Sequence, residues 1–123
     1  MGSQSKYRSQ SSHWFNLEVE DGVNPQQPGL FEWRTADGDT YIGKYTVLRI
    51  LISKYTSNVA RLINNPSFRG DRSKDLRRVY YALADDQQAG RTPTLKILEN
   101  APSDQIYVRR RELIERKQPT LNG

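Results

Sequence analysis

The chain contains no cysteine and a single histidine, His13, and these shortages exclude several kinds of site. Without cysteine it can form neither disulfides nor thiolate-bound zinc, and one histidine cannot form a metal-binding cluster. A metal site would need carboxylates around a hard cation such as Mg²⁺. No apolar run approaches the length of a membrane span, and the N-terminus lacks the apolar segment of a signal peptide. We therefore expect no membrane partner and a cytoplasmic location.

Apolar residues are also scarce, at 35% of the 123 residues. The core must be modest, although two Trp, seven Tyr and three Phe partly compensate because aromatic side chains bury much area. Lys and Arg outnumber Asp and Glu by 19 to 14, which gives a formal net charge of +5. This excess favours a polyanionic partner. The alternative is a basic domain that binds nothing acidic.

The chain divides into a short leader and one domain. Residues 1–20 begin with a stretch rich in Ser and Gln and are interpreted as a flexible leader or docking arm. Within them, residues 13–19 alternate in part, which predicts either an irregular strand or that arm. Trp14 and Phe15 give this arm an aromatic contact for a protein partner, and the alternative is that they pack on their own chain. Residues 21–123 are predicted to form a single domain.

The clearest local signal is a β-hairpin. Residues 29–35 alternate apolar with polar side chains, so that Phe31 and Trp33 share one face. Asp37-Gly38 follows and predicts the turn, because glycine adopts the positive φ that the turn requires. Residues 40–43 would form the second strand.

The remaining patterns predict helices at 46–64, 73–89 and 104–117, and a strand at 92–98. These strands are too few for a doubly wound sheet. The predicted fold is therefore α/β in the broad sense (α+β), with a small three-stranded, antiparallel-type sheet flanked by helices.

In this order of elements the chain resembles a GIY-YIG nuclease domain. Gly29-Leu30-Phe31 stands at the first half-motif and Tyr41-Ile42-Gly43-Lys44 at the second, on the two strands of one hairpin. The ending Pro119-Thr120-Leu121-Asn122 is similar to the family's closing Pro and Asn. The resemblance extends from about Gly29 to Asn122 and implies a GIY-YIG-like fold.

The resemblance also implies metal-dependent hydrolysis of phosphodiester bonds, with Mg²⁺ or Mn²⁺ as cofactor. In the family, hairpin tyrosines position and deprotonate the attacking water, an Arg of the first helix stabilises charge on the phosphate, and a late Glu holds the ion. These roles supply what the reaction needs, namely a cation and a polarised nucleophile. Matching by position assigns Tyr41 and Tyr55 to the catalytic set.

Three family positions carry other residues. Phe31 lacks the first tyrosine hydroxyl, Leu51 replaces the Arg, and Arg110 replaces the metal-binding Glu with a cation that would repel Mg²⁺. Arg49 and Glu112, each two residues away, are candidates for the missing Arg and the metal-binding Glu through a shifted register. Two residues correspond to about 200° on a helix. The alternative is that both are surface charges and Leu51 is core.

Basic residues supply the candidate nucleic-acid contacts, which are Lys44, Arg69, Arg72, Arg77, Arg78 and Arg110. Arg110 shares a helical face with Leu113 and Ile114, so it should point toward the rim of the core, whereas Arg109 and Arg111 should face solvent. Contacts would be to the backbone, with weak sequence preference and strong salt dependence.

The sequence thus predicts a GIY-YIG-like domain that binds nucleic acid, expected to be DNA, with hydrolysis reduced or lost. One alternative is an active Mg²⁺-dependent DNA endonuclease that uses Tyr41, Arg49 and Glu112. The other is a protein-interaction module on a nuclease scaffold, with Trp14 and Phe15 as its contact.

Overall fold

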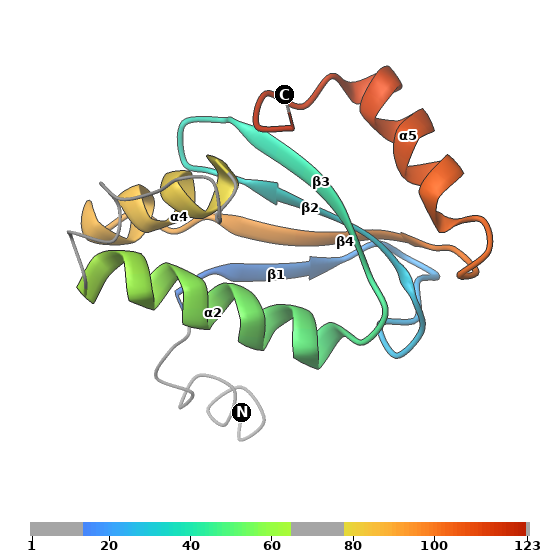
Figure 1. Cartoon of the computed structure of the whole chain (residues 1–123), viewed down its shortest axis with the longest axis horizontal. Coiled ribbons are helices and arrows are strands. Elements are labelled where there is room, and N and C mark those ends of the chain that lie inside the picture. The colour runs from blue at the N-terminus through green and yellow to red at the C-terminus, as the bar shows by residue number, and fades with distance from the viewer. Residues whose placement is uncertain (1–13, 65–77, 123) are drawn as a thin grey trace.

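The structure is a computed structural model that describes residues 14–64 and 78–122. It has the predicted α+β composition (Figure 1). The elements follow in the order β1 (Asn16–Val19), β2 (Gly29–Arg34), β3 (Thr40–Tyr45), α2 (Leu48–Asn64), α4 (Arg78–Gln88), β4 (Thr94–Asn100) and α5 (Ile106–Lys117). No helix among these residues is both long and apolar enough to cross a membrane.

The sheet has four strands in the order β1-β4-β2-β3, so the prediction of three strands is wrong. It is also mixed, because β2 is antiparallel to β3 and β4 whereas β1 is parallel to β4. β1 lies within residues 13–19, whose partial alternation left an irregular strand and a docking arm as alternatives, and all four residues of β1 are exposed. Part of the segment interpreted as a leader, residues 16–19, belongs to the sheet.

The hairpin formed by β2 and β3 is confirmed. Its turn places Gly38 at a φ of 95°, and the Thr35 amide donates to the Asp39 carbonyl at 2.9 Å. Trp33 pairs with Tyr41, and Phe31 pairs with Gly43. This register brings the two half-motifs of the family resemblance side by side.

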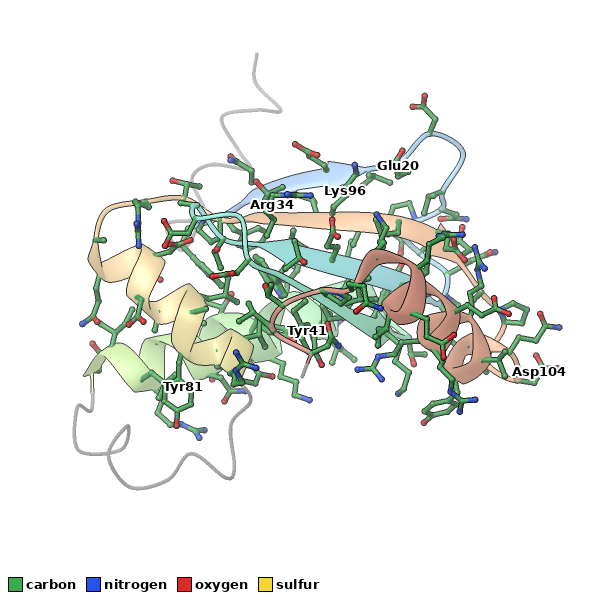
Figure 2. The ribbon with its side chains drawn as sticks, turned by 90° about the horizontal axis from the view of Figure 1, so that it is seen from above. Glu20, Arg34, Tyr41, Tyr81, Lys96 and Asp104 are labelled. Atoms are coloured by element: carbon green, nitrogen blue, oxygen red, sulfur yellow. The ribbon has the colours of Figure 1, made fainter. Side chains whose placement is uncertain are left out.

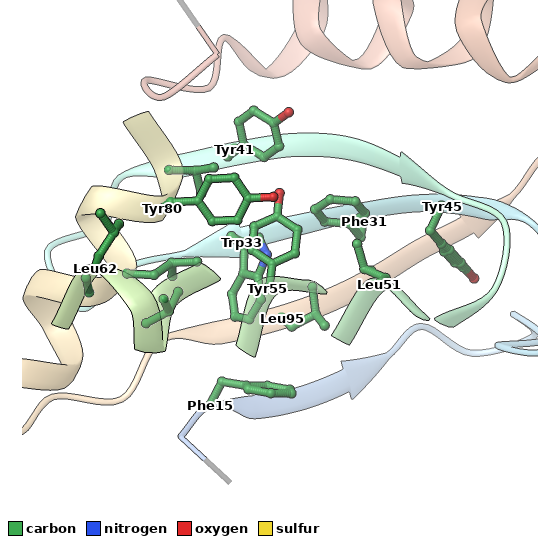
Figure 3. Packing of buried hydrophobic residues seen from close by; sticks show 14 of the residues in the cluster. Phe15, Phe31, Trp33, Tyr41, Tyr45, Leu51, Tyr55, Leu62, Tyr80 and Leu95 are labelled. Carbon is green, nitrogen blue, oxygen red and sulfur yellow. The ribbon is translucent and has the colours of Figure 1, made fainter. Parts of the chain in front are cut away.

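The two faces of the sheet carry separate cores. Phe31, Trp33 and Tyr41 face α2 and α4 within the larger, aromatic core (Figure 3). Their neighbours Leu30 and Ile42 point the other way, because side chains alternate along a strand. There they pack with residues of α5 in a smaller core, and Figure 1 shows α5 lying apart from the other two helices.

The aromatic residues before β1 pack on their own chain. The Trp14 ring stacks on Trp33 at 5.3 Å, and its Nε1 donates to Thr56 Oγ1 of α2 at 3.0 Å. Phe15 meets Trp33 edge-on at a ring distance of 5.3 Å and is 6% exposed. These contacts anchor β1, which is an edge strand of the sheet. The ion pair between Glu20, which follows β1, and Lys96 of β4 also joins the two strands (Figure 2).

The C-terminal segment covers the outer edge of β3. The Asn122 side chain accepts a hydrogen bond from the Ile42 amide at 2.8 Å and donates one to the Ile42 carbonyl at 2.9 Å. The Leu121 amide donates to the Thr40 carbonyl at 2.8 Å, and Thr120 Oγ1 accepts from the Thr40 amide at 3.1 Å. Backbone groups that an edge strand would otherwise leave open are thereby paired.

Candidate nucleic-acid interface

A cavity of about 390 Å³ lies where α2, α4 and α5 meet the hairpin. We call it the basic cavity. Its lining residues are aromatic or basic, apart from one leucine and one glycine: Phe31, Tyr41, Gly43, Lys44, Leu51, Lys54, Tyr55, Tyr80, Tyr107 and Arg110. No acidic residue lines it among the residues that the structure describes.

The basic cavity gathers the positions singled out by the family resemblance. Phe31 comes from β2, Tyr41 from β3, Leu51 and Tyr55 from α2, and Arg110 from α5. β2, β3 and α2 are consecutive, whereas α5 is distant along the chain and reaches the cavity through the fold. The three positions with diverged residues therefore lie beside the two that match.

Buried aromatic rings form the inner wall. Tyr55 lies 5.9 Å from Phe31 and 4.6 Å from Tyr80, measured between ring centroids (Figure 3). Tyr41 is 6.2 Å from Phe31. Gly43 makes room for the Phe31 ring, because a Cβ at this position would lie 2.5 Å from Phe31 Cζ. The close neighbour of Gly43 is thus a side chain of the adjacent strand β2.

Three cations surround this wall. Arg110 is half-buried and lies between Ile106 and Leu113 on the inward face of α5, as predicted from its spacing. Lys44 extends from β3 and Lys54 from α2, and both are exposed. Within residues 14–64 and 78–122 none of the three is in an ion pair with a carboxylate.

Lys54, Tyr80 and Tyr107 line the cavity but were missed from the sequence. Lys54 is three residues after Leu51 on α2, and Tyr107 is three before Arg110 on α5, so helical spacing from known positions could have found both. Tyr80 was assigned to the apolar stripe of its helix. Only the packing of α4 against α2 reveals that it also reaches the cavity.

The two candidates for a shifted register do not line this cavity. Arg49 is exposed at the start of α2. Glu112 is also exposed, and its Oε1 accepts a hydrogen bond from Arg109 Nη1 at 2.8 Å. Glu112 lines a different cavity, to which Arg109 also contributes and Arg110 does not.

This second cavity, which we call the acidic cavity, has a volume of about 400 Å³. Three carboxylates contribute to it, and its lining comprises Glu99, Asn100, Ala101, Pro102, Asp104, Gln105, Val108, Arg109 and Glu112. Arg109 was predicted to face solvent, and its side chain, 35% exposed, is also paired with carboxylates at the surface. Its Nη2 donates to Glu99 at 3.1 Å, and its Nε donates to the same carboxylate. The hydrogen bonds that Arg109 donates, first to Glu99 and then to Glu112, raise the pKa of Arg109.

The remaining basic candidates fall in two groups. Arg78 is exposed on α4, and Arg111 is exposed on α5 as predicted, and neither lines the basic cavity. Arg69, Arg72 and Arg77 lie outside the described residues.

The residues around the basic cavity do not suit the divalent ion that the family resemblance implies. Mg²⁺ and Mn²⁺ take carboxylate and other oxygen ligands, whereas this lining offers tyrosine hydroxyls among three cations. Although three carboxylates line the acidic cavity, no three His, Asp or Glu side chains of residues 14–64 and 78–122 form a group that could hold a metal ion. What the arrangement suits chemically is an anion.

No protein-family model matches the chain, and neither a curated protein nor a solved structure shows a significant similarity to it.

Proposed function

We propose that this protein binds nucleic acid by holding backbone phosphate in the basic cavity, and that it does not cut the strand. The observation that carries the proposal is the convergence of Lys44, Lys54 and Arg110 on one cavity whose described lining contains no carboxylate. A phosphate group would supply the negative charge that is missing from the described lining of this cavity.

The three cations suit phosphate in different ways. Arg110 presents a planar guanidinium that can donate two parallel hydrogen bonds to phosphate oxygens. Its half-buried position on α5 limits its movement and reduces competition from water. Lys44 and Lys54 add mobile charges at the edge, where they can follow neighbouring phosphates. Hydrogen bonds from charged donors contribute about 1.5–3 kcal/mol each.

The family resemblance gives this proposal a second support. We propose that the chain is a diverged GIY-YIG domain, because the cavity gathers Tyr41 and Tyr55 with the diverged positions Phe31, Leu51 and Arg110. Hydrolysis would need a cofactor cation, and Arg110 occupies the place where the family's carboxylate would hold it. In this view a site that cleaved nucleic acid has become a site that only binds it. The resemblance makes DNA the expected nucleic acid.

A binding and cleavage assay tests the proposal. Fluorescence anisotropy would measure affinity for a labelled DNA oligonucleotide at low salt, in EDTA and in Mg²⁺, while supercoiled plasmid reports nicking. We expect binding in both buffers, weaker in Mg²⁺ because the divalent cation competes for the phosphates, and no nicking in either. Arg110→Ala should weaken binding about tenfold or more, since it removes a charged donor. Arg111→Ala, which alters an exposed neighbour outside the cavity, is the matched control.

Other outcomes would redirect the interpretation. Metal-dependent nicking that is lost in Tyr41→Phe or Glu112→Ala would support the alternative of an active endonuclease. Equal affinity of Arg110→Ala and wild type at low salt would remove the basic cavity as the binding site. If the wild type neither bound nor cut, the interpretation as a protein-interaction module would take precedence.

A further inference from the structure

Tyr107 differs from every other aromatic residue of the basic cavity. It is 63% exposed, whereas Tyr41, Tyr55 and Tyr80 are at most 5% exposed. It stands in the first turn of α5 at the mouth of the cavity, and the Lys44 Nζ lies 4.7 Å from its ring centroid. The ring thus lines the site but contributes little to the core.

The position of this ring relative to the cations suggests a use. Tyr107 is three residues before Arg110, so their side chains are neighbours on the surface of α5. Lys44 lies against the ring from β3 and helps to hold it in place, since a cation over an aromatic face is attracted to it. A phosphate held by Arg110 and Lys44 would therefore bring its own nucleotide next to an exposed aromatic surface.

We propose that Tyr107 is a stacking platform for one nucleobase, and that the basic cavity consequently selects unpaired strands over duplexes. This inference rests on the proposed function and deepens it, because it names the class of nucleic acid. The ligand is a single-stranded segment whose phosphate contacts Arg110 and Lys44 while the adjacent base lies on the Tyr107 ring.

Two physical arguments favour an unpaired strand. In a duplex the bases are stacked on one another, and a base must leave the stack before it can contact a protein ring. The cavity, at about 390 Å³, is near the lower limit of small-molecule sites, which measure about 300–1,000 Å³. Such a space suits a single nucleotide. Because every base has an aromatic face, we expect little sequence preference.

The test measures affinities for three fluorescent probes of equal length, of which the two single strands also carry the same phosphates. These are a mixed-sequence single-stranded DNA, its blunt duplex, and a single strand with abasic sites that has the phosphates but lacks the bases in its central part. Each is titrated with wild type, Tyr107→Ala, Tyr107→Phe and Arg110→Ala. Circular dichroism and thermal unfolding confirm that the variants are folded.

We expect the wild type to bind the normal single strand most tightly. Tyr107→Ala should weaken that binding about 5- to 150-fold, the usual range for loss of one stacked base, and should leave the abasic strand nearly unchanged. Tyr107→Phe should retain the affinity, because stacking needs the ring and not the hydroxyl. Arg110→Ala should weaken binding of both single-stranded probes.

The failures of the two proposals can be distinguished. If Tyr107→Ala weakened the normal and abasic strands equally, or neither, the ring would only orient Lys44 or be idle, and the stacking proposal would be overturned while phosphate binding stood. If the duplex bound as tightly as the single strand, selection of unpaired strands would be wrong. If Arg110→Ala bound every probe as the wild type does, the proposed function itself would fail, and the stacking proposal with it.

Discussion

The two cavities beside α5 are nearly equal in volume and opposite in chemistry. Arg109 and Arg110 are consecutive residues, yet a rotation of about 100° directs them to different sites. Arg109 meets Glu99 and Glu112 in the acidic cavity, and its charge is balanced within the chain. Arg110 meets tyrosines and two lysines in the basic cavity, with no acidic lining residue described.

This difference shows that a run of arginines is not one functional unit. A charge that already has two carboxylate partners gains little from an external phosphate, because binding would have to disrupt existing bonds. A charge that lies beside other cations gains much, since an anion relieves their mutual repulsion. The partners of each side chain, and not the number of basic residues, determine which surface we propose as the interface.

Reversing the charge of Arg110 should produce the largest effect. In Arg110→Glu a carboxylate would replace the arginine donor of the basic cavity. Affinity for single-stranded DNA should then fall about 10- to 150-fold at low salt through loss of the donor, and further through repulsion of the phosphate. Arg111→Glu changes the net charge equally at an exposed position outside both cavities and should have a much smaller effect. Equal losses in anisotropy titrations would mean that only net charge matters.

Removing both lysines should change the salt dependence of binding. For single strands the slope of log K against log salt is about −0.7 per phosphate neutralised, so Lys44→Ala with Lys54→Ala should make it shallower by about 1.4. The control is Lys96→Ala with Lys117→Ala, which removes the same charge outside the basic cavity. Titrations at four or more salt concentrations measure both slopes, and identical slopes would contradict a localised site.

Arg109→Gln should separate stability from binding. It breaks the ion pairs with Glu99 and Glu112, and we expect the free energy of unfolding to fall by about 1 kcal/mol, the upper range for partly exposed pairs. Affinity for DNA should stay within about twofold. Urea unfolding and anisotropy on the same preparations check both, and a loss of affinity comparable to that of Arg110→Ala would break the distinction between the two cavities.

The smallest effect should come from Glu112→Gln. This change removes one negative charge on the far side of Arg109 and keeps an acceptor for its hydrogen bond. Glu112 is exposed and does not line the basic cavity, so about 0.1 M salt weakens the repulsion between its charge and a bound phosphate. Affinity should therefore rise by less than about twofold. A substantial decrease in affinity would show that Glu112 serves the nucleic-acid site after all.

Much of the fold could be predicted from local patterns. The hairpin, α2 and the inward position of Arg110 followed from apolar spacing and from one Asp-Gly turn, because these signals are local. β1 could be predicted only as one of two alternatives, since its alternation is short and partial and its exposed residues owe their conformation to pairing with β4. Strand content that depends on a distant partner leaves little trace in the segment itself.

The site was predictable only in part for the same reason. Tyr41, Tyr55 and Arg110 could be proposed from motif position, and the structure brings them together. The carboxylate partners of Arg109 could not, because they depend on which elements α5 contacts. Spacing along a helix gives the direction of a side chain, whereas its partners depend on tertiary packing.

Two hydrogen bonds between the Asn122 side chain and the Ile42 backbone connect the C-terminal segment to the strand beside the basic cavity. Thr40 and Ile42 are both held by this segment, and Tyr41 lies between them. Transient release of the segment would therefore free both amides together and loosen the strand that presents Tyr41, as in local openings detected by hydrogen exchange. A ligand that stabilises β3 at Tyr41 should slow hydrogen exchange at the amides of Thr40 and Ile42. The pairing of the C-terminal segment would then depend on occupancy of a cavity that this segment does not line.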